Sequence, residues 1–315
     1  MTWKVSMDTS LYRSDFVKVN GIRLHYLDWG GNGPVLLFLT GMGCSAHIFN
    51  KFAPRFIDKF HVLVLDRRGH GDSDYPETGY DADTLTEDLR QFLDLINVDK
   101  VILAGHSLGY IELCHFATFY PQRVLKLIFL DAANDNSSPE YKAVQEKNPL
   151  RNIIPAWPND DPNTTEDYVA TVKNLYPALK AIWGEVMDDQ TLHTIKTTLD
   201  GKVVDRMSDT ISAAIMDTIN SYVPDYSNIK VPVLSFYAIR DGYDYLSSEY
   251  MTENQKAQVL DYFKTVLQPF QNRYIQHFQR NVPHAKIVEI PGGHHYCFIK
   301  QEEIVFDEMS KFLSE

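Results

Sequence analysis

The chain has 315 residues, 44% of them hydrophobic, so it can bury a substantial core in one large domain with an insertion or in two smaller domains. Its formal net charge of -12 argues against non-specific binding to nucleic acid or to an anionic membrane, because its long-range field repels both. No stretch approaches the roughly 20 apolar residues of a membrane span, and residues 1–19 contain no apolar run of signal-peptide length. The three cysteines show no CxxC spacing and are too scattered for a disulfide framework, so we expect a cytoplasmic protein.

Short β-rich runs alternate with helical patterns over residues 1–134. Strands are predicted at Phe16–Val19, Arg23–Trp29, Val35–Thr40, His61–Arg67, Lys100–His106 and Leu125–Asp131. Helices are predicted between them at Ala46–Phe56, Thr84–Ile96 and Leu108–Tyr120. The Asn20-Gly21 pair predicts a tight hairpin between the first two strands. From Val35 onward the strands are almost wholly apolar, which indicates a parallel, doubly wound sheet covered by helices on both faces.

The alternation breaks after residue 134 and resumes near residue 231. Residues 135–230 contain polar loops and helical stretches such as Tyr168–Leu175 and Thr210–Ile219, with no strong strand, so we expect a helical cap there. Strands return at 231–239 and 285–290, followed by an amphipathic helix at Glu302–Leu313. The core is therefore predicted to comprise residues 1–134 and 231–315. A long helical pattern at 250–281, interrupted by Pro269, indicates a second insertion.

Ser107 lies between two glycines in Gly105-His106-Ser107-Leu108-Gly109, at the point where a predicted strand ends and a helix begins. A sharp strand-to-helix turn needs glycines for close packing, and it holds the serine hydroxyl above the sheet edge beside a helix N-terminus. The Gly-x-Ser-x-Gly motif alone is weak evidence for catalysis, but its position between a strand and a helix favours Ser107 as a nucleophile over Ser107 as a small residue in a turn.

Three further motifs follow predicted strands in order. They are Thr40-Gly41-Met42-Gly43, Asp66-Arg67-Arg68-Gly69-His70-Gly71-Asp72-Ser73-Asp74 and Ile290-Pro291-Gly292-Gly293-His294-His295-Tyr296. With these motifs the chain resembles the α/β-hydrolase superfamily, in the capped branch that includes esterases, epoxide hydrolases, haloalkane dehalogenases and C–C bond hydrolases. The resemblance covers nearly the whole chain, and it implies a mostly parallel eight-stranded sheet with helices on both faces and an inserted helical cap.

A serine nucleophile needs a base, and the base needs an acid that orients it. In this superfamily the order along the chain is serine, acid, histidine. The acid usually follows the penultimate strand, which favours Asp241 in this sequence. Asp244, three residues further on, and Asp131, at the end of the sixth strand where some relatives carry the acid, are the alternatives.

The base is one of two adjacent histidines. The Ile-Pro-x-x-Gly-His pattern of the family favours His295, which leaves His294 as a surface or supporting residue. Consecutive side chains in extended chain point in opposite directions and no carboxylate lies at a ligand spacing, so we expect no metal at this pair. Nothing else in the sequence calls for a cofactor.

The resemblance implies an oxyanion hole built from two backbone N–H groups, those of Met42 and Leu108. Gly41 lies in the same loop and is expected to border the substrate. Tyr110 stands where many relatives have a second glycine, and its ring either lines the pocket or packs in the core. Cys44, close to the oxyanion loop, is expected to be an inert buried thiol.

The type of nucleophile narrows the reaction. Haloalkane dehalogenases and epoxide hydrolases of this fold carry an aspartate where Ser107 stands, so the serine favours acyl transfer on a small-molecule ester or lactone. We expect a medium to bulky ester or lactone, such as a macrolide lactone with a cationic amino sugar, and a carboxylesterase acting on simple acyl esters is equally compatible with the sequence. We also expect a monomer or homodimer. A C–C bond hydrolase with the same triad and a hydrolase-fold ligand receptor are the alternatives.

Overall fold

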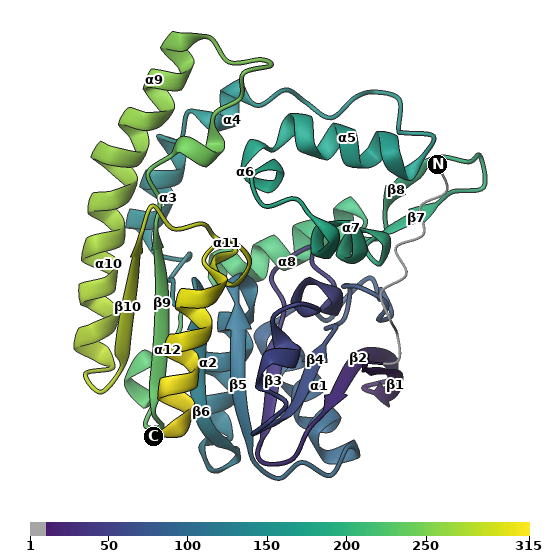
Figure 1. Cartoon of the computed structure of the whole chain (residues 1–315), viewed down its shortest axis with the longest axis vertical. Helices are drawn as coiled ribbons and strands as arrows, with labels where there is room; N and C mark the ends of the chain where they lie inside the picture. Colours follow the sequence, from purple (N-terminus) through teal and green to yellow (C-terminus); the bar gives the residue numbers. More distant parts are fainter. Residues whose placement is uncertain (1–10) are drawn as a thin grey trace.

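The computed structural model describes residues 11–315, so most of the N-terminal segment in which no signal peptide was expected lies outside the described residues (Figure 1). An eight-stranded sheet is built from β1 (Arg13–Val19), β2 (Ile22–Gly30), β3 (Val35–Leu39), β4 (His61–Leu65), β5 (Val101–His106), β6 (Val124–Leu130), β9 (Val233–Ile239) and β10 (Lys286–Pro291). The strand order is β1-β2-β4-β3-β5-β6-β9-β10. Strands β1 and β2 run antiparallel to their neighbours and the others are parallel, as expected for a doubly wound sheet.

The first two strands form the hairpin that the sequence predicts. Val19 pairs with Ile22, and the two residues between them have positive φ angles, 47° at Asn20 and 80° at Gly21. Two positive φ angles define the turn type that suits the twist of a two-residue hairpin.

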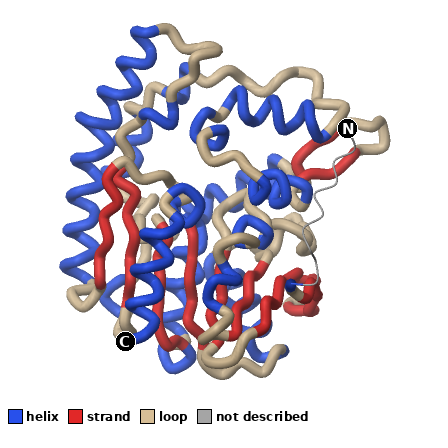
Figure 2. Tube along the Cα trace, in the orientation of Figure 1, coloured by secondary structure: helices blue, strands red, loops and turns tan. Residues whose placement is uncertain are grey.

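Helices cover both faces of the sheet (Figure 2). One face packs against α1 (Ala82–Leu95), α2 (Tyr110–Phe119) and α10 (Gln268–Asn281), and the other against α12 (Glu302–Ser314). The helix predicted at Ala46–Phe56 is instead two short 3-10 turns, Ala46–Phe49 and Ala53–Phe56. Pro54 accounts for the break, because it donates no N–H and its ring clashes with the carbonyl four residues earlier.

Residues 135–230 are mainly helical and include a hairpin that the sequence did not predict. They form α3 (Pro139–Glu146), α4 (Leu150–Ile153), α5 (Thr165–Leu175), α6 (Pro177–Lys180), α7 (Glu185–Leu192), β7 (Ile195–Thr197), β8 (Val203–Asp205) and α8 (Asp209–Ser221). In Figure 1, α5, α6 and α7 lie beyond the end of the sheet at which β10 leads into α11 (Cys297–Lys300).

The 250–281 segment is one long helical rod beside the β10 edge (Figure 1). It runs from α9 (Glu253–Tyr262) through a wide π turn (Phe263–Leu267) into α10. Pro269 does not interrupt it, because the wide turn directly before the proline carries the chain onward through a bond from the Gln268 N–H to the Phe263 carbonyl. Within residues 11–315, none of the helices combines the length and the apolar character needed to cross a bilayer.

Candidate active site

Ser107 occupies a strained turn at the end of β5. Its φ angle is 49°, which side-chain-bearing residues rarely adopt, and a 3-10 turn, Ser107–Gly109, connects it to α2. A Cβ at Gly105 would lie 2.7 Å from Leu113, and one at Gly109 would lie 3.3 Å from the Leu39 carbonyl oxygen. The two glycines therefore permit the close strand and helix approach that presents Ser107 at the sheet edge.

His295 contacts the residue before Ser107 and is oriented by Asp131. The His295 Nδ1 and an Asp131 carboxylate oxygen are 2.7 Å apart. The ring of His106, the residue before Ser107, lies 4.6 Å from the His295 ring, and its Nε2 is 3.1 Å from the His295 carbonyl oxygen. Within residues 11–315 the Ser107 hydroxyl has no hydrogen-bond partner, so its oxygen is free to meet the imidazole and a substrate.

Asp131 is buried and held by three groups. Its φ angle of 49° turns its side chain into the site, where one oxygen accepts the Ala238 N–H and the other accepts from Arg240 as well as His295. Burial alone would raise the pKa of Asp131, but the Arg240 charge and the His295 hydrogen bond overcome it and lower that pKa to about 2. Arg240 is not among the site residues predicted from the sequence, although a charged residue at the end of an apolar strand was a signal for it.

The expectation that Asp241 orients His295 is corrected by this geometry. The Asp241 side chain is exposed and accepts the Tyr243 N–H at 3.1 Å, away from the imidazole. Asp244 is also elsewhere, in an ion pair with Lys300. Of the three carboxylates weighed from the sequence, Asp131 is the one that contacts His295.

His294 is bonded to residues 135–230. Its Nε2 donates to the Ala178 carbonyl at 2.9 Å, and its Nδ1 accepts the Tyr296 N–H at 3.0 Å. Burial lowers the pKa of His294 to about 4. Because both ring nitrogens are occupied, His294 fixes the loop that carries His295 and is not placed to act as a base.

The loop after β3 lies against Ser107, where an oxyanion hole would form. A Cβ at Gly41 would lie 2.7 Å from the His106 ring and 3.2 Å from the Ser107 Cβ, so only glycine fits there. A buried arginine supports the loop, because Arg67 donates to the Thr40 carbonyl at 2.6 Å while pairing with Glu112. Met42 follows in this loop, and Leu108 occupies the first helical turn after Ser107, where backbone N–H groups lack helical partners.

Two side chains near Ser107 in the sequence or in the β3 loop, Tyr110 and Cys44, are buried in the protein interior. Tyr110 is 2% exposed and donates to the Ile219 carbonyl at 3.3 Å, so it packs α2 against α8. It is absent from the walls of the two cavities that are lined by His295 and by Met42. Of the two expectations for this ring, the structure therefore favours the core. Burial raises the pKa of the Cys44 thiol to about 11, which keeps it protonated and unreactive.

Two cavities flank the site. The larger, of about 540 Å³, has His295 in its wall, and the smaller, of about 240 Å³, has Met42 in its wall. Tyr176, Leu179 and Tyr296 border both cavities. The combined space suits a substrate of medium size that extends from the His295 side of the site to the Met42 side.

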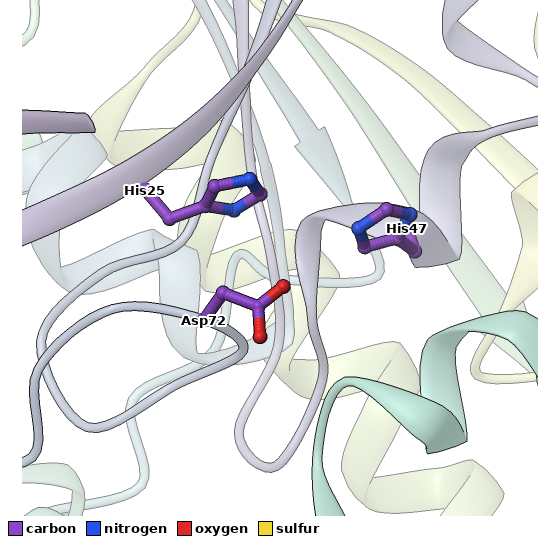
Figure 3. A group of neighbouring side chains, drawn as sticks. All are labelled: His25, His47 and Asp72. Atoms are coloured by element: carbon purple, nitrogen blue, oxygen red, sulfur yellow. The ribbon is translucent and has the colours of Figure 1, made fainter. Parts of the chain in front are cut away.

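A second cluster of polar side chains contains His25, His47 and Asp72, which face one another in Figure 3. One ligand-type atom from each lies within 4.8 Å of the others, and the buried His47 Nε2 has no hydrogen-bond partner within residues 11–315. Side chains of these types at such distances are able to ligate a metal.

The other members of this cluster are already held by protein groups. The oxygens of Asp72 accept from His193 and from Arg206, and both ring nitrogens of His25 bond to a neighbouring hydroxyl and carboxylate. The His47 and His193 rings stack with centroids 3.5 Å apart. The cluster therefore joins residues 135–230 to the sheet, and a metal there would have to displace existing partners.

Comparisons with known proteins agree with this architecture. A family model described as the alpha/beta hydrolase fold matches residues 34–301. A protein named 2-(acetamidomethylene)succinate hydrolase from Mesorhizobium japonicum is 36% identical over 101 residues, 32% of this chain and 36% of that protein. Epoxide hydrolase 4 of Homo sapiens is 32% identical over 128 residues, 40% of this chain and 35% of that protein. The matched stretches span about a third of the length of these curated relatives.

Solved structures are similar over nearly the whole chain. The structure of E-2-(acetamidomethylene)succinate hydrolase covers 96% of this chain and 100% of its own, with a TM-score of 0.73 and 23% identity. Est816, described as an N-acyl homoserine lactone degrading enzyme, covers 95% of this chain and 100% of its own, with a TM-score of 0.61 and 18% identity. At these identities the likeness shows a shared fold.

Proposed function

Because the chain belongs to the alpha/beta hydrolase family, we propose that it is a serine hydrolase that cleaves a carboxylic ester or lactone through an acyl-enzyme. The observation that supports this most is the hydrogen bond between His295 and the buried Asp131, formed beside a serine in a strained turn. A base that is oriented by a buried acid and adjoins a free hydroxyl is the arrangement that serine acyl transfer requires.

Each group has a distinct role in the proposed reaction. Ser107 attacks the substrate carbonyl while His295 takes its proton, and Asp131 stabilises the imidazolium that forms. The backbone N–H groups of Met42 and Leu108 donate to the oxyanion of the tetrahedral intermediate. His295 then protonates the leaving alkoxide and activates the water that hydrolyses the acyl-enzyme.

The serine separates this proposal from epoxide opening, although relatives named epoxide hydrolases match part of the chain. A serine that attacked an alkyl carbon would form an ether, and hydrolysis at a carbonyl could not release it. Attack on a carbonyl gives an ester, which water cleaves by the same machinery. A solved neighbour described as an esterase and another described as a lactone-degrading enzyme are in keeping with this choice.

The proposal includes residues 135–230 as a cap over the site. Tyr176 and Leu179 from this segment border both cavities, and Ala178 accepts the bond from His294. A roofed site with about 540 and 240 Å³ on its two sides favours a medium to bulky ester or lactone over a simple acetyl ester, with a macrolide at the upper limit.

Labelling with a fluorophosphonate, combined with turnover of a 4-nitrophenyl ester series, tests the proposal. The wild-type chain is expected to be labelled at Ser107 and to hydrolyse the esters, whereas Ser107→Ala loses both properties. Ser221→Ala is the matched control, because Ser221 is exposed at the end of α8. Undiminished turnover by a folded Ser107→Ala enzyme would contradict the proposal, and a wild-type chain that is neither labelled nor active would favour a ligand receptor.

A further inference from the structure

The two cavities contain different groups of the proposed catalytic machinery in their walls. His295 forms part of the wall of the larger cavity, while Met42, in the loop proposed to hold the oxyanion, borders the smaller cavity. The group that protonates the leaving oxygen must lie within hydrogen-bond reach of that oxygen. An ester bound with its leaving oxygen against His295 would place its alcohol portion in the larger cavity and its acyl portion in the smaller one.

Arg151, in α4, lies in the wall of the larger cavity without a carboxylate partner. Among the described residues, Arg151 and Arg280 are the arginines that form no ion pair, whereas every other described arginine pairs with an aspartate or glutamate. In a chain with a net charge of -12, a guanidinium that no carboxylate neutralises is an exception. Its fork of N–H donors matches a carboxylate or phosphate.

The rest of the cavity wall reinforces this charge. It is lined by aromatic, apolar, amide and imidazole side chains, and neither an aspartate nor a glutamate is among them. Asn148 lies beside Arg151, and its side-chain oxygen accepts the Leu150 N–H at 3.1 Å. This bond fixes the orientation of the Asn148 amide. The Asn148 side-chain nitrogen has no protein partner within residues 11–315, so its N–H groups are available to an anion in addition to those of Arg151.

We propose that Arg151, with Asn148 beside it, binds an anionic group on the leaving-group portion of the substrate. The preferred substrates are then esters whose released alcohol or phenol carries a carboxylate or a phosphate. This inference rests on the proposed hydrolase function and narrows its substrate class. It departs from the cationic macrolide suggested by the net charge, because the charge that a substrate meets is that of the cavity wall and not that of the whole surface.

A set of three aryl acetates tests the charge preference with the acyl group held constant. They are 4-acetoxybenzoate, 4-acetoxybenzamide and 4-acetoxyphenyltrimethylammonium, which place a negative, neutral or positive group on the leaving phenol. Intrinsic reactivity differs among them, but it cancels when each variant is compared with the wild type as a ratio of kcat/KM values. The neutral amide also reports in every variant whether the hydrolytic machinery is intact.

Arg151→Gln is expected to lower kcat/KM for the anionic acetate about tenfold, mainly through KM, and to change the value for the neutral acetate less than about twofold. Arg151→Glu is expected to lower the anionic value further and to raise that of the cationic acetate. Added salt should weaken the wild-type preference, because it screens a charge near solvent. Arg280→Gln is the matched control, an exposed unpaired arginine in α10 outside this cavity.

The same variants test on which side of the site the anion binds. Mono(4-nitrophenyl) glutarate and 4-nitrophenyl butyrate carry their difference in charge on the acyl portion, so Arg151→Gln should leave their ratio unchanged. A change in that ratio instead of the leaving-group ratio would overturn the assignment of the cavities. Equal effects of Arg151→Gln on all three acetates would overturn the anion site while leaving the hydrolase proposal intact. Wild-type inactivity on every ester would instead contradict the hydrolase proposal itself.

Discussion

The ends of β6 and β9 lie side by side in the sheet and each offers an aspartate, but the two aspartates differ in surroundings. Asp131 at the end of β6 is 1% exposed and hydrogen-bonded to His295, whereas Asp241, just after β9, is exposed and turned toward the Tyr243 N–H. The end of β9 contributes Arg240 instead, which pairs with Asp131 at 2.9 Å. One strand end supplies the carboxylate that contacts His295, and the other supplies the cation that pairs with this carboxylate.

The two strands end at different positions along the sheet, and this explains why the two aspartates differ in exposure. Leu130 pairs with Phe236, whereas β9 continues to Ile239, so the last residues of β9 extend past the end of β6. The Asp131 side chain reaches across to the Ala238 N–H, below the tip of β9. Although both strands have seven residues, β6 ends earlier along the sheet and leaves its aspartate in a buried recess, while β9 extends further and carries Asp241 out to solvent.

Removing the acid at the β6 end should have the largest effect. Asp131→Asn is expected to lower kcat about a thousand- to ten-thousand-fold, because the neutral amide neither fixes the imidazole tautomer nor stabilises the imidazolium. Kinetics on an ester that the wild type hydrolyses would measure this loss.

The same substitution also leaves the charge of Arg240 without its partner, which destabilises a folded protein. The double variant Asp131→Asn/Arg240→Gln removes that charge, and circular dichroism verifies that it is folded. Activity within tenfold of the wild type in either folded variant would show that Asp131 is not the acid.

The ion pair between Asp131 and Arg240 should make the free energy of unfolding depend on pH in the acid range. The pKa of Asp131 is lowered to about 2, against about 3.9 for an unfolded aspartate. A depressed pKa contributes stability that is present above about pH 4 and is lost as the pH falls through about 2. The loss is on the order of 2 kcal/mol of unfolding free energy.

Arg240→Gln should reduce the amount of unfolding free energy that is lost at low pH. Without the guanidinium, the effect of burial raises the pKa of Asp131 toward its unfolded value. Urea unfolding of the variant and the wild type at several pH values between 6 and 2.5 would measure this loss. Arg280→Gln, which removes an unpaired exposed arginine, controls for net charge. Parallel curves for wild type and Arg240→Gln would show that the pair does not hold Asp131 ionised.

The smallest effect is expected at the β9 end. Asp241→Asn should change kcat/KM less than about twofold and leave the urea midpoint nearly unchanged, since exposed side chains away from special features contribute little. Steady-state kinetics in parallel with Asp131→Asn make the comparison direct. A loss of the size expected for Asp131→Asn would instead return the role of acid to Asp241.

Most of the fold could be predicted because local patterns encode it. Apolar runs gave the strands of the sheet within a few residues, and the Asn20-Gly21 pair fixed the first hairpin through its two positive φ angles. The turn at Ser107 could also be predicted from the sequence, because its glycines and the strand and helix on either side are adjacent in the chain. The β7–β8 hairpin was missed because its strands are three residues each, too short for a periodic signal.

By itself, the sequence determined the order along the chain of the strands of the main sheet, the serine proposed as nucleophile, and the presence of three aspartates and two histidines that could complete the site. Only the tertiary structure decided among them, because the choice depends on how far each strand extends beside its neighbour and on which ring nitrogens find partners across the chain. Asp131 contacts His295 over 164 positions of sequence, and His294 is bound to Ala178 over 116. Contacts at such separations come from the packing of strand ends and helices, which local propensity does not specify.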